Sequence, residues 1–324
     1  MTSDPPVLEV DALTIGFAAS VEASVVSEVS LTIGQSEIVG VIGESGSGKT
    51  LTALAILGLL PGRARIFGGH IALKGLQLLS ISADARRNLM GNRIAYIPQD
   101  AMRALNPTMM VGDQVGEPFV IHRQGGWNAA RKKAVELLRS VHLAAPESRA
   151  GEYAHEYSGG MQQRAMIGMG LALSPELLIA DEPTTALDVT VQAQVIDLLR
   201  EARDIRGTSI LFVSHDLGLV VDFCDRVYVM YAGKIVEEGK VDDVFNRPAH
   251  PYTRALIEAT PSLTEPREML RSIPGQIPAA GEYGEGCRFR NRCTFAQGVC
   301  ETPPPYRTLP AEGQRARCWF AGEL

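Results

Sequence analysis

Apolar residues recur along the chain with two different periods, and the changes of period predict the elements of the fold. Segments with the character of strands are short and either alternating or wholly apolar; they fall at residues 8–15, 25–33, 38–42, 177–180 and 209–213. Helical periodicity marks residues 51–60, 129–141 and 191–203. Because strands and helices alternate through much of the chain, the pattern predicts an α/β fold in which helices flank a mostly parallel sheet.

The segment from about residue 101 to residue 157 departs from this alternation because it loses strand character. Within it, one helical stretch places Ala134 and Leu138 on one side and Arg131 and Lys132 on the other, which is typical of a helix with a solvated charged face. The middle of the chain therefore predicts a helical insertion. A hairpin is predicted later, around residues 232–233.

A glycine-rich loop separates the apolar run at residues 38–42 from the helical segment that follows it. Residues 43–50 read Gly-Glu-Ser-Gly-Ser-Gly-Lys-Thr. Strand, glycine loop and helix in this order are the context of a phosphate-binding P-loop, in which backbone N–H groups and the helix N-terminus face phosphate oxygens. The lysine can reach the β- and γ-phosphates, and the threonine hydroxyl can bind Mg²⁺. The candidate ATP-binding residues here are Gly43, Ser45, Gly46, Ser47, Gly48, Lys49 and Thr50.

Two carboxylates end the apolar strand at residues 177–180. Asp181 stands where a P-loop ATPase holds Mg²⁺. Glu182 extends one residue further, where a carboxylate can act as general base on the attacking water. A solvated acidic strand end is the alternative interpretation.

A third motif occupies residues 157–164, which read Tyr-Ser-Gly-Gly-Met-Gln-Gln-Arg. Ser158 can cap a helix, Gly159 and Gly160 allow close approach, and the helix dipole favours an anion. The N-cap of an ordinary buried helix is the alternative. Together with the two preceding motifs, this stretch resembles the signature motif of the ATP-binding cassette (ABC) ATPases, with Tyr157 where that family usually has Leu.

The resemblance to ABC ATPases implies roles for four further positions. Gln99 matches the Q-loop glutamine, which contacts Mg²⁺ or the attacking water. Asp188 ends a stretch at residues 185–188 that matches the D-loop. His215 matches the switch histidine that contacts the γ-phosphate, and Phe17 matches an aromatic residue that stacks on adenine.

The same resemblance implies a fold and a mechanism. The fold is a P-loop NTPase cassette, with a RecA-like core, an antiparallel β subdomain and an inserted helical subdomain at about residues 101–157. We expect this cassette to span residues 1–260 and a small cysteine-rich extension to span residues 261–324. Two cassettes meet head to tail, so that ATP lies between the P-loop of one subunit and the signature of the other.

Within such a site the resemblance implies that ATP binds with Mg²⁺, which Thr50, Gln99 and Asp181 hold. The residues implied in catalysis are Glu182, His215 and Gln99.

The region after the cassette narrows the resemblance. Residues 247–253 read Arg-Pro-Ala-His-Pro-Tyr-Thr, and Ile-Pro-Gly follows at residues 273–275. These stretches resemble the ATPase subunits of dipeptide and oligopeptide importers, and residues 43–62 look like the first of the two unlike ATPases in such importers. The implied partners are a second, unlike ABC ATPase, two transmembrane permease subunits and an extracytoplasmic peptide-binding protein. Related systems move nickel, glutathione or oligosaccharides, which leaves the cargo open.

Four cysteines cluster in the tail, with the spacing C-x₅-C-x₆-C-x₁₇-C: Cys287, Cys293, Cys300 and Cys318. Clustered cysteines in a cytosolic chain favour a metal over a disulfide. Zinc sites usually use closer cysteine pairs, whereas a [4Fe–4S] cluster needs only four thiolates that converge. Some members of the resembled family carry such a cluster, so a [4Fe–4S] cluster is expected, with Zn²⁺ or free structural thiols as alternatives.

Composition limits the other classes of function. The chain has 324 residues, and its net charge of −6 offers no broad basic surface, so no nucleic-acid partner is expected. Its longest apolar run is far shorter than the roughly 18 residues of a membrane helix, and residues 1–6 lack the pattern of a signal peptide. We expect a peripheral protein at the cytoplasmic face of the cell membrane. A soluble cassette acting on nucleic acid or ribosomes and a metal-sensing regulatory ATPase are the alternatives.

Overall fold

The computed structural model describes residues 5–17, 24–185, 187–260 and 272–323, and it divides the chain into two compact units. Unit 1 comprises Met1–Val7, Ile33–Glu37 and Ser80–Phe212. Unit 2 comprises Leu8–Thr32, Ile38–Leu79 and Val213–Leu324. Each unit is thus assembled from segments that are far apart in the sequence.

The strands of unit 1 follow the spatial order β8-β7-β6. Their bounds are β6 (Ile94–Ile97), β7 (Leu177–Asp181) and β8 (Ser209–Ser214), the last of which begins in this unit. β6 and β7 run parallel, with Ile94 opposite Leu177 and Ile97 opposite Ala180. The polar residues that follow β6 and end β7 therefore lie at the same edge of the sheet.

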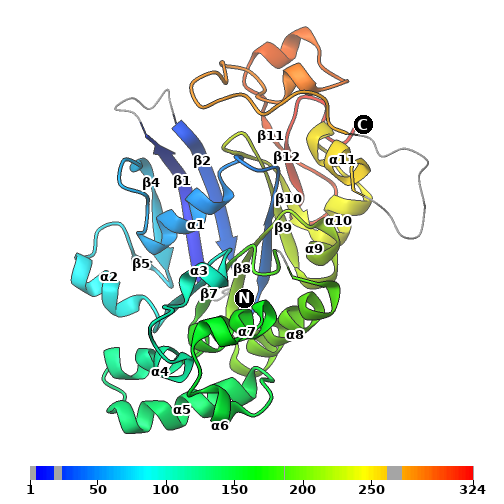
Figure 1. Ribbon diagram of the computed structural model, residues 1–324. Coiled ribbons are helices and arrows are strands. Elements are labelled where there is room, and N and C mark those ends of the chain that lie inside the picture. The colour runs from blue at the N-terminus through cyan, green and yellow to red at the C-terminus, as the bar shows by residue number, and fades with distance from the viewer. Residues whose placement is uncertain (1–4, 18–23, 186, 261–271, 324) are drawn as a thin grey trace. The chain divides into compact units, whose positions relative to one another are not determined.

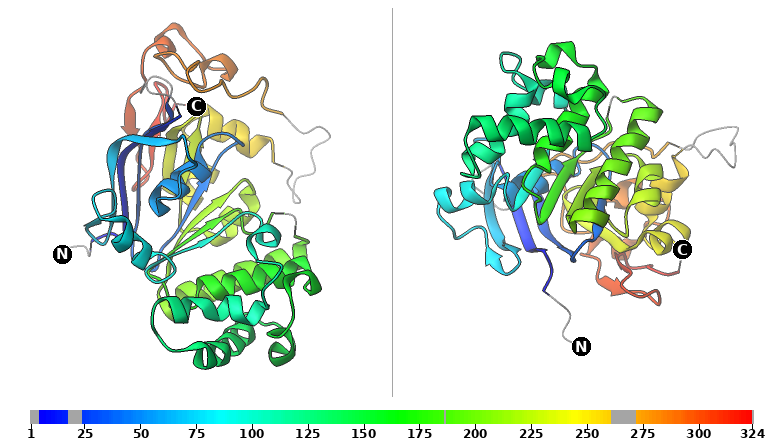
Figure 2. Two further views of the ribbon diagram at one scale, coloured as in Figure 1. Left: turned by 60° about the vertical axis from the view of Figure 1, so that its left-hand side comes forward. Right: turned by 90° about the horizontal axis from the view of Figure 1, so that it is seen from below.

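Unit 1 is otherwise helical. Its helices are α2 (Ala83–Leu89), α3 (Ala101–Ala104), α4 (Val111–Ile121), α5 (Trp127–Ser140), α6 (Pro146–Arg149), α7 (Gly159–Gly170) and α8 (Val189–Arg206), with a 3₁₀ turn at Ala154–Glu156. The chain between β6 and α7 is helical, as its loss of strand pattern predicts. Helices α4, α5 and α7 pack against one another, and Figures 1 and 2 show this group in green and cyan-green. On α5, Ala134 and Leu138 are fully buried.

Unit 2 contains an antiparallel sheet with the order β2-β1-β4-β5. Its strands are β1 (Leu8–Gly16), β2 (Ser24–Ile33), β4 (Arg65–Leu73) and β5 (Leu76–Gln77). The register of the long pair β1 and β4 runs from Leu8 opposite Leu73 to Gly16 opposite Arg65. These strands, blue and cyan in Figure 1, match the antiparallel subdomain that the resemblance to ABC ATPases implies.

The remaining strands of unit 2 follow the order β11-β12-β10-β9-β3. They are β3 (Ile38–Ile42), β9 (Arg226–Tyr231), β10 (Lys234–Lys240), β11 (Tyr306–Thr308) and β12 (Arg315–Arg317). β3 and β9 are parallel, whereas β9 and β10 form the hairpin predicted around residues 232–233. β12 pairs antiparallel with β10, so the C-terminal tail adds strands to this sheet.

Four helices of unit 2 are α1 (Lys49–Leu57), α9 (Leu217–Phe223), α10 (Val241–Asn246) and α11 (Pro251–Glu258), and 3₁₀ turns occur at Arg290–Arg292 and Gly298–Glu301. α1 ends earlier than the apolar pattern at residues 51–60 predicts. Gly58 adopts a φ of 72° and donates its N–H to the Ala55 carbonyl, which closes the helix.

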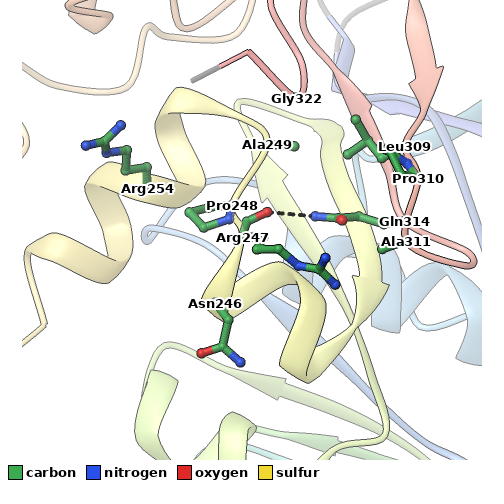
Figure 3. Close-up of a pocket in the computed structure, with 10 residues that line it drawn as sticks. All are labelled: Asn246, Arg247, Pro248, Ala249, Arg254, Leu309, Pro310, Ala311, Gln314 and Gly322. Carbon is green, nitrogen blue, oxygen red and sulfur yellow. Dashed lines mark hydrogen bonds between the residues drawn. The ribbon is translucent and has the colours of Figure 1, made fainter.

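The chain end packs against the segment that precedes α11. Gln314 Nε2 donates to the Arg247 carbonyl oxygen at 3.0 Å, the contact drawn in Figure 3, and to the buried Glu237 carboxylate at 3.0 Å. An open cavity of about 560 Å³ lies beside this contact, bordered by the α10–α11 connection and by the turn that contains Leu309 and Ala311. The tail is therefore an integral part of unit 2.

Candidate functional site

The glycine loop of unit 2 lies between β3, which is buried throughout, and α1. Two of its glycines occupy positions that other residues do not fit. Gly43 has a φ of 151°, and a Cβ there would lie 2.1 Å from the Met230 carbonyl oxygen. Gly48 has a φ of 108°, and a Cβ there would lie 2.7 Å from the Met230 methyl carbon. The loop needs glycine because it lies directly against the end of β9.

Two polar side chains are buried inside this loop. Lys49 is 6% exposed, and its Nζ donates to the carbonyl oxygens of Gly43 at 2.8 Å and Glu44 at 3.1 Å. Ser47 is fully buried, and its hydroxyl has no hydrogen-bond partner among the described residues. A buried ammonium and an unpartnered hydroxyl at a helix N-terminus suit a phosphate, whose oxygens accept hydrogen bonds from both. The loop therefore fits the phosphates of a nucleotide.

In unit 1, the carboxyl edge of β6 and β7 gathers Gln99, Asp181 and Glu182. Asp181 is 1% exposed and accepts a hydrogen bond from Tyr96 Oη at 3.3 Å; burial and the Asp181 charge raise the pKa of Tyr96. Glu182 accepts hydrogen bonds from Gln99 Nε2 at 2.9 Å and from Thr185 Oγ1 at 3.0 Å. Its φ of 49° is left-handed, a strained state that is common at functional sites.

The signature segment begins α7. Ser158 Oγ accepts a hydrogen bond from the Met161 N–H at 3.3 Å, which makes Ser158 the N-cap. Gly160 allows close packing of α7 on α8, because a Cβ there would lie 2.8 Å from Val191 Cγ1. A Cβ at Gly159, in contrast, would meet nothing within 4 Å. Gly159 therefore leaves the start of the helix open to an approaching group.

The other three residues of the resemblance lie at the ends of elements. Asp188 caps α8, since its Oδ1 accepts from the Val191 N–H at 3.0 Å. His215 follows β8 and is exposed. Phe17 follows β1 and is 48% exposed, as a stacking platform requires. Ala186, within the D-loop stretch, lies outside the described residues.

The four tail cysteines come together, but not as a metal site. Cys287, Cys293, Cys300 and Cys318 line one cavity of about 10 Å³. Among the described residues, no group of three or more His, Cys, Asp or Glu side chains is placed to hold a metal ion. Burial raises the pKa of Cys287 to about 11 and also raises the pKa values of Cys293 and Cys318. The predicted [4Fe–4S] cluster, and with it the zinc alternative, is wrong.

Two residues that no motif indicated contact the glycine loop. Tyr252 Oη accepts a hydrogen bond from the Glu44 N–H at 2.8 Å, and Arg292 forms an ion pair with the Glu44 carboxylate. Tyr252 belongs to the stretch at residues 247–253, which indicated a branch of a family but not this contact. Arg292 stands in an arginine-rich tail, where no pattern distinguishes it from its neighbours.

A phosphate-binding glycine loop and an Asp–Glu pair at the end of a parallel strand define a P-loop ATPase, and the capped Ser-Gly-Gly helix is typical of the ABC class. Comparison with known proteins agrees. The profile of the ABC transporter family matches residues 26–185, and that of the oligopeptide/dipeptide transporter C-terminal region matches residues 236–300.

Two relatives are similar over almost the whole chain. A probable peptide ABC transporter ATP-binding protein of Sinorhizobium fredii is 49% identical over 91% of this chain and 89% of its own length. The dipeptide transport ATP-binding protein DppD of Escherichia coli is 41% identical over 97% of this chain and 96% of its own length. Among solved structures, a dimeric ATP-binding cassette in a post-hydrolysis state with ADP and Pi matches with a TM-score of 0.64 and 25% identity, over 72% of this chain and 98% of that one.

The chain belongs to the ABC transporter family, in its oligopeptide/dipeptide branch, and is an ABC-type ATPase that uses ATP and Mg²⁺. Every helix among the described residues is too short or too polar to cross a membrane.

Proposed function

We propose that this chain hydrolyses ATP to power the import of dipeptides or oligopeptides through a membrane permease. The observation that carries the proposal is the presence, on one chain, of an ABC cassette and of the C-terminal region of oligopeptide/dipeptide transporters. The names of the two relatives, a probable peptide transporter ATPase and a dipeptide transport ATPase, support the same cargo.

ATP binding is assigned to the glycine loop. Backbone N–H groups of the loop and the N-terminus of α1 face the phosphates, and the buried Ser47 hydroxyl gains an acceptor there. Lys49 moves from the loop carbonyls to the phosphates, where its charge offsets the negative charge of ATP. Phe17 stacks on the adenine, since its exposed ring is available at the end of β1.

Hydrolysis is assigned to the strand-end residues. The oxygen donors of Thr50, Gln99 and Asp181 are of the kind that Mg²⁺ prefers, and the ion supplies positive charge to the phosphates when it is bound. Glu182 takes the proton of the attacking water, and its hydrogen bond from Gln99 fixes the carboxylate in position. His215 is assigned to the γ-phosphate, where an imidazole N–H can donate a hydrogen bond.

The signature acts on the partner's nucleotide. Ser158, Gly159 and Gly160 form a capped, open helix start that fits a γ-phosphate bound to a second cassette. Asp188 belongs to the same dimer interface. We infer that the second cassette is an unlike ABC ATPase, so that the working unit is a heterodimer at the cytoplasmic face of the membrane, with two permease subunits and an extracytoplasmic peptide-binding protein. We place the boundary between cassette and extension near residue 260.

Reconstitution of the chain with its partner ATPase and permeases in proteoliposomes tests the proposal. Peptide-loaded binding protein should stimulate ATP hydrolysis and drive peptide uptake. The variant Glu182→Gln should still bind ATP and hold the dimer closed, but its turnover should fall by about 10²-fold or more, because the general base is lost. Glu201→Gln, which changes an exposed carboxylate of α8, is the matched control.

Three results would contradict parts of this assignment. Turnover of Glu182→Gln at the wild-type rate would remove Glu182 from the role of base. Stimulation by nickel, glutathione or oligosaccharide in place of peptide would reassign the cargo. Failure of any permease to associate with the chain in detergent, together with co-purification of RNA or DNA, would exclude transport.

A further inference from the structure

The C-terminal tail holds the P-loop through a buried arginine. The Arg292 side chain is 5% exposed, and its guanidinium meets the Glu44 carboxylate with both terminal nitrogens, at 2.7 and 3.0 Å. Glu44 is the second residue of the glycine loop, and both residues belong to unit 2. A two-pronged pair of this kind fixes both distance and angle, which a single contact does not.

Every N–H group of Arg292 has an acceptor. Besides the two bonds to Glu44, Nε donates to the Pro274 carbonyl at 2.7 Å, and the terminal nitrogens also reach Tyr231 Oη and the Ile273 carbonyl, each at 3.4 Å. The Glu44 carboxylate raises the pKa of the guanidinium, so its charge is permanent. The Arg292 guanidinium is thus fixed by hydrogen bonds to residues of the tail, of the end of β9 and of the glycine loop.

Glu44 is held at its backbone as well. Its N–H donates to Tyr252 Oη at 2.8 Å. Its carbonyl oxygen accepts from Lys49 Nζ at 3.1 Å, so the resting position of the P-loop lysine depends on where Glu44 lies. The ring of Tyr252 packs on that of Tyr231, with centroids 4.6 Å apart. Any shift of Glu44 is therefore passed directly to the group that must reach the phosphates.

A second arginine of the same segment supports the loop from its other side. Arg288 donates to the Ala232 carbonyl and, at 2.9 Å, to Ser27 Oγ. The neighbouring Gly233 donates its N–H to the Ser47 carbonyl oxygen at 2.8 Å. Residues 288–292 therefore approach the P-loop at both ends, at Glu44 and through the β9–β10 turn.

We propose that Arg292 is a positioning residue for ATP binding, which acts through Glu44 to hold the P-loop and Lys49 in the geometry that receives phosphate. This inference rests on the proposed ATP site and extends it, because it makes the C-terminal extension a part of the nucleotide-binding machinery.

The test compares affinity with stability in the full chain. In Arg292→Met, the dissociation constant of Mg·ATP, measured by titration calorimetry, should rise about tenfold, within the usual range of coupling between linked groups. Its thermal midpoint should fall, because the half-buried Glu44 carboxylate loses its partner. Arg292→Lys, which keeps the charge but not the two-pronged geometry, should give an intermediate dissociation constant.

The double variant Glu44→Gln with Arg292→Met separates positioning from general stability. Removing both charges should restore most of the thermal midpoint, since no carboxylate is left unpaired. The affinity for Mg·ATP should stay low, because nothing holds residue 44. Arg307→Met removes an equal charge from an exposed ion pair of the same tail and should bind Mg·ATP like the wild type.

The proposal is overturned if Arg292→Met or the double variant binds Mg·ATP within twofold of the wild type. It is equally overturned if affinity rises and falls with the thermal midpoint across the set, since that is the signature of a purely structural role. Failure of the wild-type chain itself to bind Mg·ATP would instead refute the ATP site on which the inference rests.

Discussion

The substitution Ser47→Ala removes a hydroxyl that the folded P-loop buries completely. Ser47 Oγ is without a hydrogen-bond partner in the described part of the chain, so the folded state gives up the hydroxyl's contact with water and gains nothing in exchange. An unsatisfied buried polar group costs about 1–3 kcal/mol. Without nucleotide, Ser47→Ala should therefore raise the free energy of unfolding by about 1 kcal/mol, the lower end of this range.

The effect on nucleotide binding should have the opposite sign. A hydrogen bond to a charged group contributes about 1.5–3 kcal/mol, so the dissociation constant of Mg·ATP should rise at least about tenfold when the hydroxyl is removed. At a fixed excess of nucleotide, tenfold weaker binding lowers the stabilisation by ATP by about 1.4 kcal/mol. Urea unfolding with and without Mg·ATP measures both changes on the same samples.

Ser209→Ala is the matched control because the side chain is equally buried but fully paired. Ser209 Oγ donates to the Gly34 carbonyl at 2.8 Å and accepts from the Ser36 N–H at 2.9 Å. This variant should lower the free energy of unfolding by about 1 kcal/mol or more. If Ser47→Ala destabilises the nucleotide-free chain as Ser209→Ala does, or binds Mg·ATP like the wild type, then the unpartnered hydroxyl is not a phosphate contact.

Two further substitutions test the packing of the glycine loop and the pH dependence of stability. Gly43→Ala places a Cβ 2.1 Å from the Met230 carbonyl oxygen at a positive φ, so it should lower the free energy of unfolding by about 3 kcal/mol or more and abolish Mg·ATP binding. Gly62→Ala is the control, because its Cβ would meet nothing within 4 Å, and it should change neither quantity. Thermal unfolding measures the stability of both variants, and calorimetry measures their binding of Mg·ATP. Burial lowers the pKa of His250 from 6.5 to about 3. Below pH 6.5 the unfolded chain therefore binds a proton that the folded chain does not. As the pH is lowered from 6.5 to 3, the free energy of unfolding should fall by about 1.4 kcal/mol per pH unit. His250→Asn, which can still cap α11 but does not titrate, should flatten this slope in urea titrations at pH 4.5 and 7, and an unchanged slope would mean that other groups cause it.

Local features of the chain were predictable from its sequence because they depend on neighbouring residues. The strand before the P-loop, the strand that ends at Asp181 and the cap at Ser158 all follow from short patterns, whereas the cap at Asp188 was found only in the structure. Contacts made by distant residues were not predictable. The pair between Glu44 and Arg292 joins positions 248 apart, and several other arginines of the tail, among them Arg288 and Arg290, lie close to Arg292 in the sequence.

The four tail cysteines also show that contacts between distant residues cannot be read from the sequence. The clustering of four cysteines in the sequence, together with the family resemblance, predicted a metal site, and in the structure the four residues line one cavity. Metal binding depends in addition on how the folded tail places the side chains around the ion. Among the described residues, no group of three or more His, Cys, Asp or Glu side chains is placed to hold a metal ion, and the linear spacing of cysteines does not carry that property.

The extension contacts the rest of unit 2, including the glycine loop, by more than one kind of bond, which explains why it belongs to unit 2 and not to a separate body. β12 adds to β10, where Ala316 lies opposite Glu237. The Glu237 carboxylate accepts hydrogen bonds from Gln314 Nε2 and from the N–H groups of Ala249 and His250. Ala249 and His250 directly precede α11, and Tyr252 in that helix accepts the hydrogen bond from the Glu44 N–H. Pairing of the tail with β10 therefore positions α11, whose Tyr252 contacts the P-loop at the Glu44 backbone. Arg292 makes the second contact, with the Glu44 carboxylate.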